Sequence, residues 1–307
     1  MTASGQMGRE PDDRALGRIG VWLSTLGSVS AAEARAAARA IEDLGYGTLW
    51  IGETGASKDA LTNAAILLAA TDRIVIATGI ASVWARDATT TNAAALALGE
   101  AYPGRFVLGL GVSHRNLVAR RGHIYARPLS KMREYLDELD EADYVAPRPV
   151  VPVRRVLAAL APKMLELAAE RSSGAHTYFM PTQHTRRARE ALGAGPLLAP
   201  EQAVVLDSDA ARARAIARRH MSFYLGQPNY VKTLRTFGWD DDDLTGGGSD
   251  RLVDALVAWG DVETVADRLR EHLQAGADHV AVQPLGADLQ DAVAQLRALA
   301  PAAAELP

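Results

Sequence analysis

Candidate catalytic chemistry begins at His114, which comes shortly after the apolar run of residues 106–110. A continuous apolar run is typical of a strand buried on both faces, as in a parallel sheet. The run gives way to Gly111, Ser113 and His114, and α/β proteins place their chemistry at such carboxyl ends of strands. A histidine there can give or take a proton near neutral pH. The alternative is a histidine that only hydrogen-bonds the loop that follows it.

Acidic side chains are scarce at the other expected strand ends, where Glu53 is the only carboxylate. This scarcity argues against a two-carboxylate glycosidase and against a carboxylate-bridged metal pair. His114 and His176 alone are too few for a zinc site, so we expect no metal. Glu53 is a second candidate catalytic residue, able to hold a ring nitrogen or a sugar hydroxyl. Its alternative is a buried ion pair with a nearby arginine.

Residues 157–164 combine small side chains with a proline that opens a helix. Small side chains let a ligand approach the backbone, and the free N–H groups at a helix start suit a phosphate. The alternative is an ordinary turn between a strand and a helix. The predicted members of this anion site are Ala159, Leu160, Ala161 and Lys163. The turn that ends in His176 is a similar candidate.

Two tryptophans, Trp22 and Trp84, are placed to stack on a flat ligand. Trp50 lies inside an apolar strand and is predicted to be a core residue. Residues 112–128 have neither helical nor strand periodicity, and a loop of this length is typically a functional lid. This lid would bring Arg115 and Asn116 to the substrate. Gln183 and His184 are predicted to be surface residues near a helix start.

Strand and helix patterns alternate along residues 18–307, and this alternation predicts one (β/α)8 barrel domain, an α/β fold, with an open doubly wound sheet as runner-up. A turn-rich stretch, residues 226–259, predicts a helical insertion between strands 7 and 8. Residues 1–17 predict a disordered tail. The expected strands span residues 18–23, 48–51, 73–77, 106–110, 153–160, 175–180, 203–206 and 279–283. The expected helices span residues 31–44, 59–70, 89–101, 129–142, 163–170, 186–192, 209–224, 262–275 and 289–299.

The composition of the chain excludes several classes of chemistry and of binding partner. The chain has 307 residues, 48% of them hydrophobic, a formal net charge of -4 and no cysteine. Thiolate catalysis and disulfides are therefore excluded. No long cationic run points to nucleic acid, and no apolar stretch is long enough for a membrane span or a signal peptide. We expect a cytoplasmic protein that acts on a small molecule and binds neither nucleic acid nor membrane.

The sequence resembles the luciferase-like monooxygenase superfamily, and within it the oxidoreductases that depend on the deazaflavin coenzyme F420. The resemblance covers roughly residues 17–301, and it rests on the order and spacing of several motifs rather than on one. These motifs are Thr48-Leu-Trp-Ile-Gly-Glu53, Ile76-Ala-Thr-Gly-Ile-Ala-Ser82, Arg105-Phe-Val-Leu-Gly-Leu-Gly-Val-Ser-His114, Pro128-Leu-Ser-Lys-Met-Arg-Glu-Tyr-Leu136, Leu160-Ala-Pro-Lys-Met164 and Gly174-Ala-His176.

This resemblance implies a (β/α)8 barrel, commonly called a TIM barrel, with an insertion before the last strand, and a homodimer. It also implies a non-prolyl cis peptide bond between Gly79 and Ile80, behind the ring of a bound F420. His114 matches a position that holds a protonating acid in sugar-phosphate-oxidising relatives. The cofactor-binding residues that we predict are Gly79, Ile80, Ser113, Ala159, Leu160, Ala161, Lys163 and His176.

The predicted activity is hydride transfer between F420 and a small organic substrate, with His114 as acid or base. One alternative is a monooxygenase that uses flavin mononucleotide (FMN), because the same barrel accepts either ring system. Another is a non-catalytic protein that binds the deazaflavin or the flavin. The residues predicted to contact substrate or to form the lid are Trp22, Trp84, Arg115 and Asn116.

Overall fold

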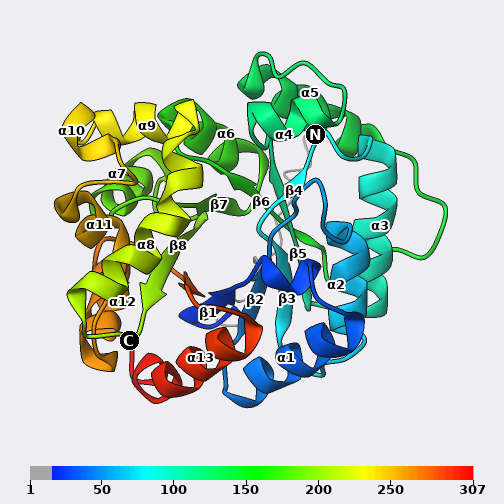
Figure 1. Ribbon diagram of the computed structural model, residues 1–307. Coiled ribbons are helices and arrows are strands. Elements are labelled where there is room, and N and C mark those ends of the chain that lie inside the picture. The colour runs from blue at the N-terminus through cyan, green and yellow to red at the C-terminus, as the bar shows by residue number, and fades with distance from the viewer. Residues whose placement is uncertain (1–15, 307) are drawn as a thin grey trace.

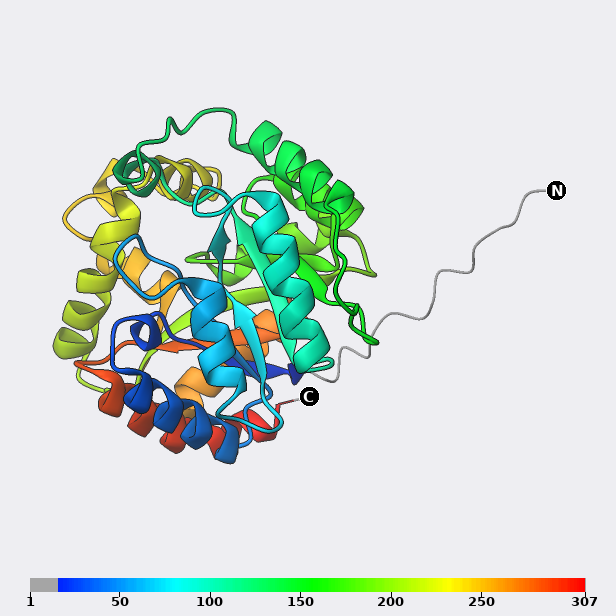
Figure 2. The ribbon, with the colours of Figure 1, turned by 90° about the vertical axis from the view of Figure 1, so that its right-hand side faces the viewer.

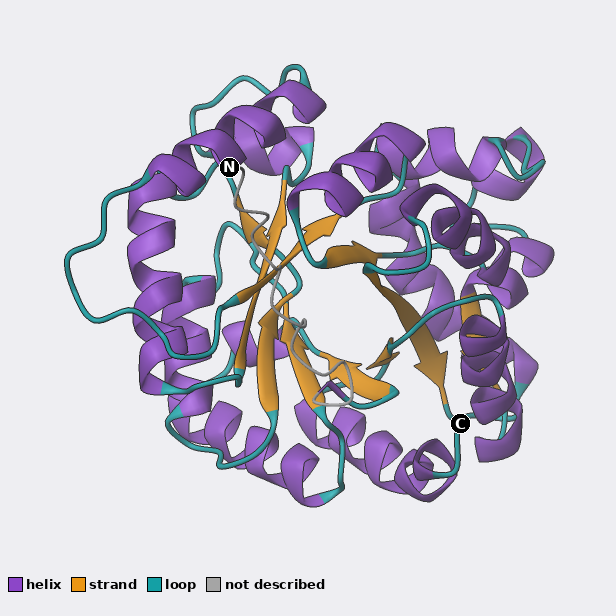
Figure 3. Cartoon of the chain, turned by 180° about the vertical axis from the view of Figure 1, so that it is seen from behind, coloured by secondary structure: helices purple, strands orange, loops and turns teal. Residues whose placement is uncertain are grey.

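The computed structural model describes residues 16–306, and its centre is a closed barrel of parallel strands. The barrel order is β1, β2, β3, β5, β6, β7, β8 and β10, and the pairing of β10 with both β8 and β1 closes it. Figure 3 shows these strands enclosed by helices. The eight-stranded (β/α)8 barrel is thus confirmed, and the open sheet is excluded.

The strands are β1 Ile19–Trp22, β2 Thr48–Ile51, β3 Val75–Thr78, β4 Ala81–Ser82, β5 Phe106–Gly111, β6 Arg154–Ala158, β7 Gly174–Thr177, β8 Leu197–Val205, β9 Val257–Trp259 and β10 Val280–Pro284. The helices are η2 Thr25–Gly27, α1 Ala31–Asp43, α2 Ala60–Leu68, α3 Ala88–Ala101, α4 Arg115–Arg120, α5 Pro128–Glu141, α6 Pro162–Arg171, α7 Thr182–Leu192, α8 Ala210–Leu225, α9 Pro228–Arg235, α10 Asp241–Leu244, α11 Asp250–Leu256, α12 Val262–Gln274 and α13 Leu289–Ala304. Figure 1 labels most of them. No helix of residues 16–306 is both long and apolar enough to cross a membrane.

Apolar side chains form separate layers inside and outside the barrel. Trp50, Ala77 and Val107 belong to the cluster inside it, while a larger cluster joins the strands to the surrounding helices. Trp50 is fully buried, as the sequence predicts. Helix α13 packs against α1, which joins the two ends of the described chain (Figure 2). The strands and the surrounding helices thus form the framework from which the segments at the strand ends can build a site.

Local sequence signals account for most helix starts. Ser30 and Glu33 form the expected capping box at α1, in which Ser30 Oγ accepts from the Glu33 N–H at 3.2 Å and Glu33 accepts from the Ser30 N–H at 3.0 Å. Asp59 and Asp87 cap α2 and α3 by simple N-caps, in which the aspartate side chain accepts from the N–H of Thr62 and of Thr90, respectively. Pro162 opens α6 at its first position, as the sequence predicts.

Several predicted boundaries are wrong. The seventh barrel strand begins at Leu197 rather than at residue 203, because Glu201 and Gln202 interrupt its apolar pattern although both are buried. The insertion of residues 226–259 contains the expected helices α9, α10 and α11, and it ends in strand β9, which pairs with β8 and was not predicted. The predicted lid contains a short helix, α4.

The predicted tail reaches two residues too far. Leu16 is buried, and its carbonyl accepts a hydrogen bond from Thr48 Oγ1 at 2.6 Å, while the Gly17 carbonyl contacts His279 Nδ1 at 2.7 Å. Leu16 and Gly17 therefore belong to the base of the barrel. The rest of the predicted tail, residues 1–15, lies outside the described residues.

Candidate functional site

A cavity of about 780 Å³ opens at the carboxyl ends of the barrel strands. It is lined by segments that follow β1, β2, β3, β5, β6 and β7, and by side chains of α8 and α9. The predicted site residues that line it are Trp22, Glu53, Gly79, Ile80, Ser113, His114, Ala159, Leu160, Ala161 and His176. The side chains of Trp84, Arg115, Asn116 and Lys163 do not line it.

The floor of the cavity is built by Trp22, Gly79 and Ile80. The peptide bond between Gly79 and Ile80 is cis, as the resemblance implies. The Trp22 indole N–H donates to the Gly79 carbonyl at 3.1 Å, and a Cβ on Gly79 would lie 2.5 Å from that indole nitrogen. Only glycine therefore fits beneath Trp22, and the two residues form a flat, apolar surface.

Tyr178 lines the cavity next to Trp22. Its ring lies 5.0 Å from that of Trp22, and its hydroxyl donates to Gln283 Oε1 at 2.8 Å and contacts the Tyr224 hydroxyl at 2.8 Å. These bonds join β10 and helix α8 across the mouth of the barrel. The floor is therefore fixed by hydrogen bonds as well as by packing.

His114 stands at the mouth of the cavity, just before helix α4. The centroid of its ring lies 5.9 Å from that of Phe223, in an edge-on arrangement, and 5.6 Å from that of Tyr230. Burial lowers the pKa of His114 below its usual 6.5, and a hydrogen bond to Asn229 opposes this shift only in part. Among the described residues Nδ1 has no hydrogen-bond partner. At pH 7 His114 is thus a neutral imidazole whose Nδ1 is buried and unpartnered among the described residues.

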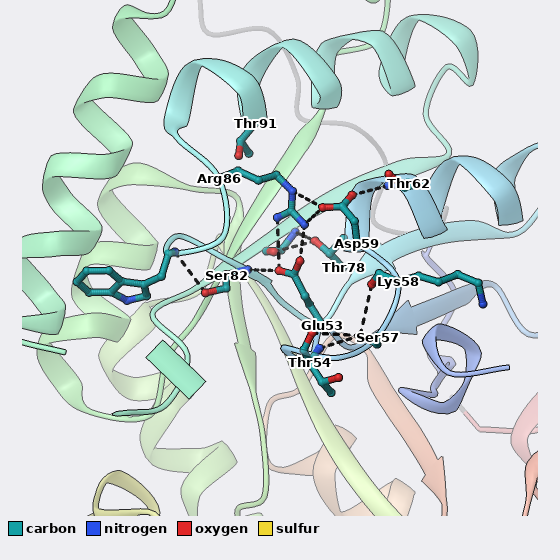
Figure 4. A network of polar contacts seen from close by, with 12 residues as sticks. Glu53, Thr54, Ser57, Lys58, Asp59, Thr62, Thr78, Ser82, Arg86 and Thr91 are labelled. Atoms are coloured by element: carbon teal, nitrogen blue, oxygen red, sulfur yellow. Dashed lines mark hydrogen bonds and ion pairs between the residues drawn. The ribbon is translucent and has the colours of Figure 1, made fainter. Parts of the chain in front are cut away.

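The carboxylate of Glu53 is engaged by its neighbours, as Figure 4 shows. It forms an ion pair with Arg86, which also pairs with Asp59, and it accepts from the Ser82 N–H at 2.8 Å. The side chains of Glu53 and Arg86 are 3% and 10% exposed. The structure therefore shows the buried ion pair that was the alternative for Glu53, and this pair holds β4 beside the cavity.

Two helix starts, those of α6 and α7, meet at one end of the cavity. Neither Ala161 nor Pro181, the residues before these helices, provides a side-chain cap for the N–H groups. Arg187 and Lys232 line the same end, and Arg187 donates to Thr236 Oγ1 at 3.0 Å. Uncapped N–H groups and two cations favour an anion here. Lys163 is exposed and points elsewhere, so its side chain adds nothing to this end.

His184 is not a surface residue, contrary to the prediction. It is 2% exposed and lines the cavity between the two helix starts. Its Nε2 lies 2.9 Å from the Leu160 carbonyl oxygen. Sequence reasoning missed it because helix α9 and the following Phe237, which bury it, are distant in the chain. Other missed residues of the cavity include Arg187, Phe223, Tyr224, Asn229, Tyr230 and Lys232.

His176 is a buried member of the cavity wall. Its ring stacks on Trp50 with a centroid distance of 4.6 Å, and its Nδ1 lies 2.7 Å from the Ala199 carbonyl oxygen. Burial lowers the pKa of His176 to about 4, so the ring is neutral at pH 7. The carbonyl can only accept, so Nδ1 carries the proton and Nε2 is left as an acceptor.

The predicted lid is fastened by Trp84. Its indole N–H donates to the Val112 carbonyl at 3.0 Å, and its ring lies 5.7 Å from that of His123 and 6.5 Å from that of Tyr125. Tyr125 lines the cavity, and the Arg115 guanidinium lies over the Tyr125 ring, 5.6 Å from its centroid. Trp84 therefore acts on the cavity through the lid.

Glu201 is a buried acid beneath the tyrosines of the cavity wall, and sequence reasoning did not place it in a strand. Its Oε2 accepts from the Phe179 N–H at 3.0 Å, while Oε1 has no partner among the described residues. Burial raises the pKa of Glu201 from 4.5 to about 8. The folded protein therefore holds a proton here that the unfolded chain releases above pH 4.5.

Replacing Glu201 by glutamine is expected to stabilise the fold increasingly as the pH rises. Between pH 4.5 and 8 the folded state binds more protons than the unfolded state, so wild-type stability falls with pH in this window. The variant has no carboxyl group here and does not lose stability in this way. Its free energy of unfolding, relative to that of the wild type, should therefore rise by up to about 1.4 kcal/mol per pH unit. Thermal unfolding of both proteins at pH 5, 6.5 and 8 measures it. An advantage that is the same at pH 5 and pH 8 contradicts the buried-acid assignment.

Comparisons with known proteins agree with this geometry. Residues 15–279 match the family model described as luciferase-like monooxygenase. A 5,10-methylenetetrahydromethanopterin reductase from Methanolobus tindarius is 25% identical over 304 residues, which cover 83% of this chain and 91% of the relative.

Two solved structures share the fold of this chain. The coenzyme F420 dependent tetrahydromethanopterin reductase from Methanopyrus kandleri has a TM-score of 0.77 at 18% identity, with 92% of this chain and 98% of that chain covered. The oxygenating constituent of 3,6-diketocamphane monooxygenase from Pseudomonas putida, in complex with FMN, has a TM-score of 0.68 at 16% identity. That comparison covers 94% of this chain and 97% of the other.

Proposed function

Because the chain belongs to the luciferase-like monooxygenase family, we propose that it is a coenzyme F420-dependent oxidoreductase that transfers a hydride between the deazaflavin and a small organic substrate. One observation carries this proposal. A single cavity combines a flat apolar floor, an end suited to an anion and a neutral histidine at its mouth. The Methanopyrus kandleri reductase, which shares the fold, is named for coenzyme F420 and supports that choice.

The residues of the cavity fit such a cofactor. The floor at Trp22 and Gly79 is flat and apolar, as a planar ring requires. The uncapped starts of α6 and α7, with Arg187 and Lys232, would hold its phosphate. When bound, the deazaflavin supplies a ring carbon that gives or accepts a hydride.

The protein's own task at the mouth of the cavity is to move one proton. Because His114 is neutral and lines the cavity, its ring can accept a proton from a substrate hydroxyl as a hydride leaves the same substrate. In the reverse direction the protonated ring returns that proton. Val112, Leu117 and Phe223 line the cavity close to this end, and their apolar side chains exclude water.

An FMN-dependent monooxygenase is the second candidate, because the Pseudomonas putida structure contains FMN. Anaerobic titration with F420 and with FMN, each followed by its absorbance, separates the two. We expect F420 to bind more tightly and to change its redox state with a substrate present, without oxygen. Tight binding of FMN alone, together with turnover that consumes oxygen, would replace this proposal by the monooxygenase.

Removing Arg187 is expected to weaken F420 binding about tenfold to a hundredfold, because a hydrogen bond to a charged group contributes about 1.5–3 kcal/mol. The loss should shrink as salt is added, since the interaction is partly Coulombic. Calorimetric titration of Arg187→Ala measures it. Arg186→Ala is the matched control, because Arg186 is exposed on the same helix and does not line the cavity. If both variants lost the same affinity for F420, the phosphate would not bind at this end of the cavity.

A further inference from the structure

His184 has a hydrogen-bonding pattern that an anion next to it would change. A carbonyl oxygen can only accept, so the 2.9 Å contact between Nε2 and the Leu160 carbonyl places the ring proton on Nε2. Nδ1 is then a bare acceptor, and it is buried without a partner among the described residues. An acceptor nitrogen repels a phosphate oxygen, whereas an imidazolium would donate to both the carbonyl and the phosphate.

The surroundings keep the ring neutral while no anion is bound. Burial lowers the pKa of His184, the hydrogen bond to Leu160 opposes this shift, and Arg187 on the same helix adds to the lowering. From the neighbouring elements the titratable and charged groups are His272 of α12, itself neutral with a pKa lowered to about 3, and Lys232 of α9. No carboxylate lines this end of the cavity within residues 16–306.

We propose that His184 is an anion-binding residue that takes up one proton from solvent when the phosphate of the cofactor binds, and then donates to that phosphate through Nδ1. The cavity at the starts of α6 and α7 is thereby completed by a third cation, which appears only when the anion is present. This inference rests on the proposed function, because it needs a phosphorylated ligand at this end. No covalent bond forms or breaks.

Proton uptake makes the affinity depend on pH with a definite sign. The pKa of His184 is lowered in the free protein and rises when the negative phosphate lies beside it. Between these two values binding takes up a proton, so the affinity falls by up to about tenfold for each unit of rising pH. Below both values and above both values His184 contributes no pH dependence.

Isothermal titration calorimetry of the intact protein tests the proposal. F420 is titrated at one pH in buffers of different ionisation enthalpy, and the slope of the measured heat gives the number of protons taken up. The reference probe is the phosphate-free deazaflavin riboside, which has the same ring and therefore the same ring titration. We expect close to one additional proton for F420 within the window. An equal proton count for both probes would overturn the proposal.

The variant His184→Asn isolates the residue. Asparagine cannot be protonated, so the additional proton uptake should vanish, while F420 should still bind but with a lower affinity than to the wild type. His220→Asn is the matched control, because His220 is also buried, with a pKa lowered to about 4, but does not line the cavity. This control should keep the wild-type count. Uptake that persists in His184→Asn would assign the proton elsewhere and overturn the inference.

These outcomes are distinct from failure of the proposed function. If F420 binds with the expected ring contacts but no additional proton is taken up, the role of His184 is wrong and the oxidoreductase proposal stands. If neither F420 nor its phosphate-free analogue binds, both proposals are wrong. Calorimetry distinguishes these cases because it measures the heat of binding and the proton count in the same titrations.

Discussion

Replacing His114 by alanine is expected to lower turnover about 10²–10⁴-fold, which is the usual contribution of a general acid or base. The affinity for F420 should change little, because His114 contacts Phe223 and Tyr230 at the mouth rather than the floor or the anion end. Steady-state kinetics with the reduced and oxidised coenzyme, combined with binding titrations, measures both quantities. Turnover equal to that of the wild type would remove His114 from the mechanism.

The pH profile gives an independent check of the same residue. Burial lowers the pKa of His114 below 6.5, so the neutral base persists into mildly acidic solution and is lost only below that pH. For oxidation of a hydroxyl, activity should therefore fall on the acidic side, and this limb should be absent from the residual activity of His114→Gln. His123→Ala is the matched control, since His123 belongs to the lid but does not line the cavity.

Replacing Arg86 by methionine is expected to destabilise the fold by about 3–5 kcal/mol, because it leaves a buried carboxylate without its cation. The Glu53 side chain is 3% exposed, and without Arg86 the Ser82 N–H would be its remaining hydrogen-bond donor among the described residues. Denaturant unfolding of both proteins measures the free-energy difference. Adding Glu53→Gln to Arg86→Met should restore part of the loss, because it removes the unpaired charge.

A surface arginine provides the contrast. Arg212 pairs with Asp207 and Asp209, but its side chain is 67% exposed, so Arg212→Met should cost less than about 1 kcal/mol. If the Arg86 and Arg212 variants lost the same stability, the ion pair of Glu53 would not be the buried element that holds β4 in place.

The barrel could be predicted from the sequence because the signals for its strands and helices are local. Apolar runs such as residues 106–110 and helix caps such as Ser30 depend on neighbours in the chain, and both appear where they were expected. Strand β8 was misplaced because Glu201 and Gln202 look exposed in a one-dimensional pattern, although the barrel buries them. Strand β9 has three residues, which is too short for any periodicity.

The site was predictable only where it is built by strand ends. His114 was found because it follows a recognisable strand, whereas the Gly79–Ile80 cis bond was expected from the family resemblance. His184 and Arg187 sit inside helix α7, and Asn229 and Lys232 belong to the insertion. Their position in the cavity depends on how the insertion packs over the barrel, and no local pattern encodes that packing.

The most direct measurement is a crystal structure of the protein soaked with F420. We expect the ring to lie on the floor formed by Trp22, Gly79 and Ile80, with its phosphate between the starts of α6 and α7 and within hydrogen-bond distance of Arg187. A coenzyme bound outside this cavity, or one whose phosphate points to solvent at the opposite end, would contradict it.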